Sequence, residues 1–187
     1  GFGQFDVRVT PLQMAMVSAS IANQGVLMRP QLIDLVVASN LNVLSQPEPV
    51  VLSSPMSKLT AGFLTRMMVD SVEVGAATRA GISSIAVAGK TGTAQVFGRN
   101  ANGSAKADTS WFASYGPTNK PRFAVVMMVS QGGFGASVSG VGARKIYETL
   151  FGVEGSKVSS AKILFPSGIP PVGLPKISPA TKVKGAK

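Results

Sequence analysis

A lysine, two threonine hydroxyls and a glycine stand together inside an apolar stretch, residues 85–96. The stretch reads Ile-Ala-Val-Ala-Gly-Lys-Thr-Gly-Thr-Ala-Gln-Val, and its β-branched residues and lack of proline predict a strand. A buried strand would not tolerate the ammonium of Lys90, whereas an edge strand that lines a cleft would. Such an edge can receive an extended peptide. We expect Lys90 and the hydroxyls of Thr91 and Thr93 to hold an anion such as a peptide's terminal carboxylate, while Gly92 allows close backbone approach.

Two named motifs and one plain alternative compete for these residues. The run Gly-Lys-Thr at 89–91 ends a phosphate-binding loop, but that motif needs a glycine at position 84, which is serine. It also needs an aspartate after the next apolar strand, where Ser130 stands. Lys-Thr-Gly is also the third signature of the penicillin-interacting serine enzymes, after Ser-x-x-Lys and Ser-x-Asn. Taken alone, a turn with a solvated lysine explains these residues equally well.

The composition limits which residues could catalyse a reaction or bind a metal. The chain has 187 residues, enough for one domain, and it contains no cysteine and no histidine. A disulfide scaffold and a thiolate metal site are therefore excluded, and we expect neither a metal nor a cofactor. Any catalysis would use Lys, Ser, Thr, Tyr or carboxylates. The longest apolar run, Phe123 to Val129, is far too short to span a membrane.

The charge is unevenly distributed. Of the net charge of +10, residues 1–154 hold twelve basic and eight acidic residues, and residues 155–187 hold six lysines and no acid. The tail also carries five prolines, so we predict a folded domain over 1–154 and a disordered, basic Pro/Lys-rich tail over 155–187. The aromatic residues do not alternate with a basic stripe, so nucleic-acid binding is not expected.

Local signals predict the elements that would position the motif strand. Thr10, Pro11 and Gln13 predict a capped helix that Gly25 closes. A second helix is expected from about Lys58 to Val74, with one apolar face formed by Leu59, Phe63, Leu64, Met67, Met68 and Val72. A third is expected to begin at Ser139 and end at Gly152.

The remaining segments predict strands and connections. Residues 110–115 alternate as a strand, and residues 123–129 are apolar on both faces, as in a central strand covered on both sides. With the motif strand they would form an antiparallel meander with the motif strand at one end. Residues 26–37 predict one short strand, and the proline-containing residues 39–55 a surface connection. Residues 97–108 and 131–142 predict flexible loops, and Arg79 a solvated charge.

The order of these elements and several short sequences resemble the C-terminal part of a penicillin-binding protein transpeptidase domain. The matching segments are Val-Thr-Pro-Leu-Gln at 9–13, Ile-Ala-Asn-Gln-Gly at 21–25, Ala-Gly-Lys-Thr-Gly-Thr-Ala-Gln at 88–95 and Trp-Phe at 111–112. The resemblance covers residues 3–152, and residues 3–32 are closest to an actinobacterial, monofunctional (class B) group. It implies an α+β fold of β-lactamase/transpeptidase type, an α/β sandwich with an antiparallel sheet covered by helices, incomplete at its N-terminal side.

The resemblance also implies an activity and roles for single residues. The family member would be a D,D-transpeptidase that cross-links peptidoglycan stem peptides through an acyl-serine, and β-lactams would acylate the same serine. Lys90 would add positive potential and help to order proton transfer. Thr91 and Thr93 would grip the carboxylate, the Thr93 N–H would be one of two oxyanion donors, and Gly92 would keep the strand open for docking.

One departure from the family pattern is large. Neither Ser-x-x-Lys nor Ser-x-Asn precedes Lys90, and the match at Ser159 to Lys162 lies in the basic tail, where it is a coincidence. We therefore expect the nucleophile to lie outside this chain, and the fragment alone to be inactive and marginally folded. Its parent would work at the extracytoplasmic membrane face through an N-terminal anchor outside the chain, with stem peptides, β-lactams and divisome proteins as partners.

Two other functions remain open. The chain could be a non-catalytic module that binds D-Ala-D-Ala peptides or β-lactams, or it could be a relative of the serine carboxypeptidases and β-lactamases, which share Lys-Thr-Gly. The helix end Ala-Asn-Gln-Gly at 22–25 favours the transpeptidase branch.

Overall fold

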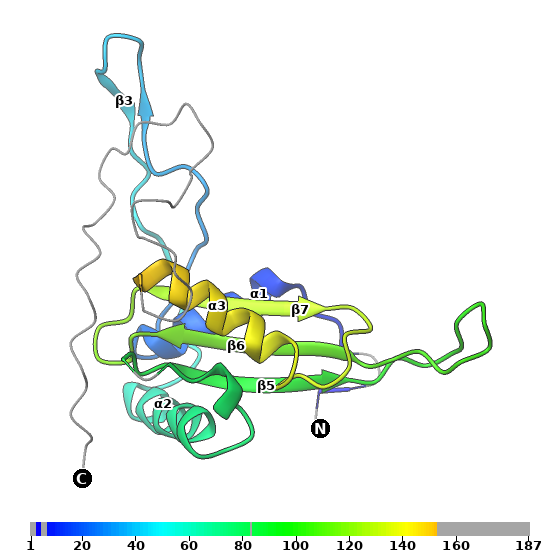
Figure 1. Ribbon diagram of the computed structural model, residues 1–187. Coiled ribbons are helices and arrows are strands. Elements are labelled where there is room, and N and C mark those ends of the chain that lie inside the picture. The colour runs from blue at the N-terminus through cyan, green and yellow to red at the C-terminus, as the bar shows by residue number, and fades with distance from the viewer. Residues whose placement is uncertain (1–2, 5–6, 83, 153–187) are drawn as a thin grey trace.

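The computed structural model describes residues 3–4, 7–82 and 84–152. An antiparallel sheet stands between helices, which confirms the predicted α+β class. Figure 1 shows α3 crossing in front of the sheet, α1 behind it and α2 beside the start of β5. The sheet order is β5-β6-β7. The bounds are α1 Pro11–Ala22, α2 Lys58–Glu73, the 3-10 helix η1 Thr78–Ala80, β5 Ala88–Ala94, β6 Thr109–Gly116, β7 Phe123–Val129 and α3 Ser139–Phe151.

The helix ends follow the local signals closely. At the start of α1 the Gln13 N–H donates to Thr10 Oγ1 over 3.2 Å, and the Thr10 N–H donates to Gln13 Oε1 over 2.8 Å, as in a capping box. The helix ends at Ala22, and Gly25, with φ +95°, lies so close to Met56 that a Cβ there would clash with the Met56 carbonyl oxygen. The third helix ends at a left-handed Gly152, as predicted.

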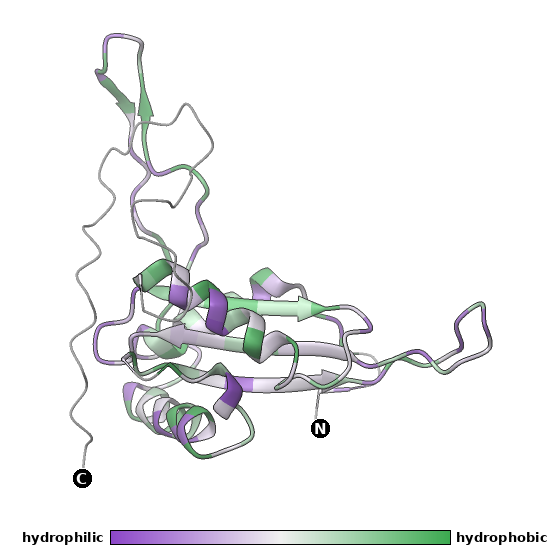
Figure 2. Cartoon of the chain, viewed as in Figure 1, coloured by the Kyte–Doolittle hydropathy of each residue, from purple (hydrophilic) through white to green (hydrophobic). Residues whose placement is uncertain are grey.

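The meander is confirmed, but two details differ from the prediction. The motif strand covers only Ala88–Ala94, and Ile85 makes an isolated bridge to Ile82 instead of joining the ladder. Among the described residues β6 lies in the middle and β7 is an outer strand, as expected of a sheet that is incomplete at its N-terminal side, although the apolar pattern of residues 123–129 by itself predicted a central strand. Helices α1 and α3 contact β7, which agrees with its apolar pattern, shown in Figure 2 beside the paler β5.

The segment between α1 and α2 forms an arm that leads away from the sheet (Figure 1). Strand β1, Leu27–Met28, pairs with β4, Val51–Ser53, and further out β2, Val36–Val37, pairs with β3, Val43–Ser45. The prediction of one strand over 26–37 was therefore wrong, since two short strands lie there. Residues 39–55 lie on the surface, as predicted, but they also supply the paired strands β3 and β4. Pro30, Pro47 and Pro49 stand between the two pairings and Pro55 follows β4, so the prolines shape the arm without interrupting its ladders.

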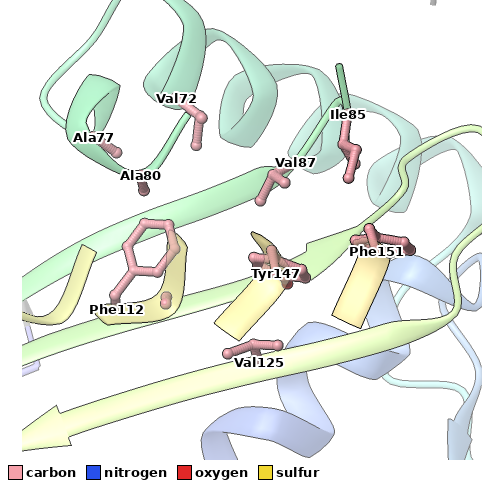
Figure 3. Packing of buried hydrophobic residues seen from close by; sticks show 10 residues of the cluster. Val72, Ala77, Ala80, Ile85, Val87, Phe112, Val125, Tyr147 and Phe151 are labelled. Carbon is pink, nitrogen blue, oxygen red and sulfur yellow. The ribbon is translucent and has the colours of Figure 1, made fainter. Parts of the chain in front are cut away.

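Two buried clusters stabilise the sheet, one on each face. The α3 side holds the larger cluster, in which Phe112 of β6, Tyr147 and Phe151 follow one another along the sheet, with Tyr147 in the middle (Figure 3). The other side holds Ile21, Met68, Ala88 and Tyr115. The predicted apolar face of α2 is only partly buried: Met68 and Val72 are inside, whereas Leu59, Phe63 and Met67 are exposed. No helix of the described residues is long and apolar enough to cross a membrane.

Candidate functional site at the edge of β5

The Lys-Thr-Gly segment lies on the edge strand, as predicted. β5 pairs with β6 on one side, and among the described strands none pairs with its other side. Lys90 is exposed, and its Nζ donates a hydrogen bond of 2.7 Å to the Thr91 carbonyl oxygen. The two ion pairs found in the described residues, Arg66–Asp70 and Arg144–Glu148, do not include this lysine. Its positive charge is therefore available to a ligand at the edge.

Strand alternation separates the site residues onto two faces. Ala88 packs in the α1/α2-side cluster, so Lys90 and Gly92 share that face. Thr91 and Thr93 share the α3 face, where they stand opposite Phe112 and Ser110 of β6. The ammonium and the two hydroxyls, which we expected to hold one anion, thus leave the strand in opposite directions. They can act together only on a ligand that runs along the edge itself.

Two glycines of β5 permit close packing. A Cβ at Gly89 would clash with the ring of Phe112, so this glycine lets the aromatic ring of the neighbouring strand lie against the sheet. A Cβ at Gly92 would lie 3.1 Å from Trp111 Cβ, on the same face as Lys90. Gly92 therefore leaves room beside Trp111 on the face that carries the lysine.

One contact of Thr93 could not be predicted from the sequence. Its hydroxyl accepts a hydrogen bond of 3.2 Å from the Gly135 N–H, in the loop between β7 and α3. The sequence predicts only a flexible loop there, and the glycines at 132, 133 and 135 are its one local signal for a close approach of the backbone. Arg79, expected to be a solvated charge, donates to Ser137 Oγ of the same loop over 3.4 Å.

Other features of the chain lie apart from this edge. A cavity of about 380 Å³ lies between the end of α1 and the start of β7 and is lined by none of the predicted site residues. The Ser159 to Lys162 match and the basic tail fall outside the described residues. The exposed edge of β5 therefore remains the candidate site.

Comparisons with known proteins point in one direction. The family model "Penicillin binding protein transpeptidase domain" matches residues 1–148. The peptidoglycan D,D-transpeptidase PbpA of Mycolicibacterium smegmatis is 34% identical over 141 residues, which are 74% of this chain and 27% of that protein. The Mycobacterium tuberculosis PbpA is 32% identical over the same length.

Solved structures give the same result. Penicillin-binding protein A from M. tuberculosis, an imipenem acyl-enzyme complex, superposes with a TM-score of 0.68 at 30% identity over 79% of this chain and 32% of that one. The D,D-transpeptidase domain of a peptidoglycan glycosyltransferase from Eggerthella lenta has a TM-score of 0.64 at 33% identity, over 75% of this chain and 33% of that one. The chain thus spans about a quarter of the length of its curated relatives, 27% for the M. smegmatis PbpA, and about a third of the length of the solved chains.

Proposed function

Because this chain belongs to the penicillin-binding protein transpeptidase family, we propose that it supplies the peptide-docking wall of a D,D-transpeptidase that cross-links peptidoglycan stem peptides. The observation that carries this proposal is the position of Lys90, Thr91 and Thr93 on an edge strand with an unpaired side. An extended stem peptide adds to that edge by main-chain hydrogen bonds, and the side chains of β5 select its carboxylate end.

The direction of the backbone groups supports this docking mode. The Lys90 ammonium donates a hydrogen bond to the Thr91 carbonyl oxygen. This oxygen therefore points away from β6, toward the unpaired side of β5. Every second residue of a strand directs its N–H and C=O to the same edge, so those of Thr93 share this direction. The Thr93 N–H is then one of two donors to the oxyanion of the tetrahedral intermediate, a role worth about 10²–10³ in rate.

The side chains on the two faces of β5 have different roles in the proposed function. On the α3 side the Thr91 and Thr93 hydroxyls donate to the substrate carboxylate, and on the other side Lys90 adds positive potential and orders proton transfer. Gly92, between the two threonines, keeps the docking edge free of a side chain on the lysine's face.

The rest of the reaction belongs to the proposed parent protein. Its serine attacks the penultimate D-Ala carbonyl, D-Ala leaves, and an amine of a second stem peptide takes the acyl group from the serine. The relative captured as an imipenem acyl-enzyme supports acylation of the same serine by β-lactams. We place the parent at the extracytoplasmic membrane face, held by an N-terminal anchor, with divisome proteins as partners.

Acylation by a fluorescent penicillin tests the proposal. In the parent, Lys90→Ala and Thr93→Val should each slow acylation at least about tenfold, because each removes a charge-assisted contact. Lys120→Ala, in the turn between β6 and β7, is the matched control and should leave the rate unchanged. The 187-residue chain alone should form no stable adduct. An unchanged rate in Lys90→Ala, or an adduct on the isolated chain, would reject this assignment.

A second function has one observation in its favour. β5 presents its unpaired side and the exposed Lys90 whether or not a nucleophile stands beside it, which is all that a module that binds without reacting requires. Such a module would bind D-Ala-D-Ala peptides reversibly and would never be acylated in any longer form. Mass spectrometry of the parent after treatment with a β-lactam separates the two functions.

A further inference from the structure

We propose that Gly135 is a positioning residue for Thr93, and that its N–H fixes the threonine hydroxyl as a donor to the carboxylate of the bound peptide. This inference rests on the proposed function of the β5 edge and adds to it a group from outside the Lys-Thr-Gly strand. Thr93 Oγ1 accepts from the Gly135 N–H over 3.2 Å, across a sequence separation of more than forty residues.

The loop between β7 and α3 lies against the backbone of β5 and β6 at Gly135. A Cβ on Gly135 would lie 2.8 Å from the Trp111 carbonyl oxygen and would clash with the carbonyl oxygen of Gly92. Both obstacles are main-chain atoms of the sheet, so they cannot turn aside. Any other residue at 135 must therefore push the loop away from β5 and lengthen the contact to Thr93.

Hydrogen bonds hold the loop in this place from both ends. The Gly133 N–H donates to the Asp108 carbonyl oxygen over 2.8 Å, and the Gly140 N–H donates to the Gly135 carbonyl oxygen over 2.9 Å. At the start of α3, the buried Ser139 hydroxyl lies 2.7 Å from the buried Ser110 hydroxyl, and the Ser139 N–H also donates to Ser110 Oγ over 3.1 Å. Ser110 is the cross-strand neighbour of Thr93, so the loop is anchored beside the residue that it contacts.

The hydrogen bond from Gly135 affects how the Thr93 hydroxyl can bind a ligand. A threonine hydroxyl has one proton to donate and two lone pairs to accept. Because the Gly135 N–H occupies a lone pair, the oxygen is fixed in place and its own proton stays free for an acceptor. A carboxylate is the acceptor that gains most, since hydrogen bonds to charged groups are the stronger ones. Gly135 thereby pre-orients the hydroxyl before the peptide arrives.

Paired ligands test this inference in the parent transpeptidase. Gly135→Ala should slow acylation by a carboxylate-bearing β-lactam roughly tenfold, the size of one lost hydrogen bond to a charged group, and should have little effect on the methyl ester of the same drug. In a Thr93→Val background, Gly135→Ala should have no further effect. Gly140→Ala is the matched control, because a Cβ there meets only ordinary contacts at 3.6 Å.

The outcomes separate this inference from the proposed function. Equal slowing with both ligands, or an undiminished effect of Gly135→Ala in the Thr93→Val background, would overturn the inference. If Thr93→Val itself leaves acylation unchanged, the proposed function fails instead. Should Gly135→Ala not fold, hydrogen exchange of the Gly135 amide is measured instead, in proteins that keep Gly135. That exchange must speed up severalfold in Thr93→Val and stay unchanged in Thr93→Ser, and any other pattern rejects the contact.

Discussion

The two faces of the sheet are packed very differently. On the α3 side, Tyr147 and Phe151 stack with ring centroids 6.1 Å apart, and Phe123 meets Phe151 edge-on at 5.6 Å. These rings belong to a cluster that extends from the end of α2 across the sheet to the end of α3. The α1/α2 side has only a small cluster around Met68 and Tyr115. The sheet as a whole is therefore stabilised chiefly from the α3 side, whereas β5 itself packs against α2 and contributes Ala88 to the smaller cluster.

The same contrast holds for the exposed surface. On α2, Leu59, Phe63 and Met67 point into solvent, and on α1 so do Leu12 and Val17. Scattered apolar side chains are normal on a protein surface, but here they lie along two neighbouring helices that pack on each other. The face that presents Lys90 and Gly92 is thus the face with the least buried and the most exposed apolar surface. We expect substitutions on the two faces to have unequal effects.

The largest effect is expected for Phe112→Ala. Phe112 is fully buried in the α3-side cluster, and its ring fills the space that Gly89 leaves open. Removing the ring should lower the free energy of unfolding by about 3–5 kcal/mol. Urea denaturation followed by circular dichroism measures this loss. Met68→Ala, on the other face, is the comparison and should lose less, and an equal or larger loss there would contradict the contrast between the faces.

Much of this architecture could be predicted, since it depends on local signals. The capping box at Thr10 and Gln13, the cap at Ser57 and the left-handed Gly152 define helix ends without knowledge of the fold. The alternation in residues 110–115 identified β6 and the meander around it. The Lys-Thr-Gly segment could be placed on an edge, because a central strand does not accommodate an exposed ammonium.

The remainder depends on contacts between distant segments. The arm strands β1 to β4 have only two or three residues each, too few for a periodic pattern. Which half of the apolar face of α2 becomes buried depends on the neighbours that the fold brings to it. The contact between Gly135 and Thr93 joins residues that are 42 positions apart, and no sequence pattern near either residue predicts it.

The second prediction concerns alkaline pH and the α3 side. Burial raises the pKa of Tyr147 well above 10, and a weaker opposing effect comes from its hydrogen bond to Ser114. In the unfolded chain this tyrosine would ionise near pH 10, so stability is fully present below pH 10 and is lost as the pH rises above it. Denaturation midpoints between pH 9 and 11.5 should fall with pH. Tyr147→Phe should flatten that fall, and identical slopes for the two proteins would show that Tyr147 ionises equally easily in both states.

A smaller effect is expected on the α1/α2 side. The Tyr115 hydroxyl donates to Thr65 Oγ1 over 2.6 Å and joins β6 to α2. Tyr115→Phe keeps the ring and removes this bond, so it should cost about 1 kcal/mol of unfolding free energy. Thr65→Val should cost a similar amount, and the double variant should cost little more than either single one. Additive losses in that double-mutant cycle would mean that the bond contributes nothing.

The smallest effect is expected for Phe63→Ser on α2, and it is the most informative about the two faces. Phe63 is 62% exposed, so its replacement should change the unfolding free energy of this chain by no more than about 0.5 kcal/mol. Met68→Ser, five residues further along α2 and buried, is the matched control that should be destabilising.

The same pair of substitutions in the proposed parent transpeptidase sharpens the comparison. If the rest of the parent covers the exposed face of α2, Phe63→Ser becomes a core substitution there and should cost more than 2 kcal/mol, while Met68→Ser costs about the same in both proteins. Thermal denaturation of the four variants measures the difference. A neutral Phe63→Ser in the parent would mean that this face stays in solvent, and the thin packing beneath Lys90 would then be a property of the working enzyme.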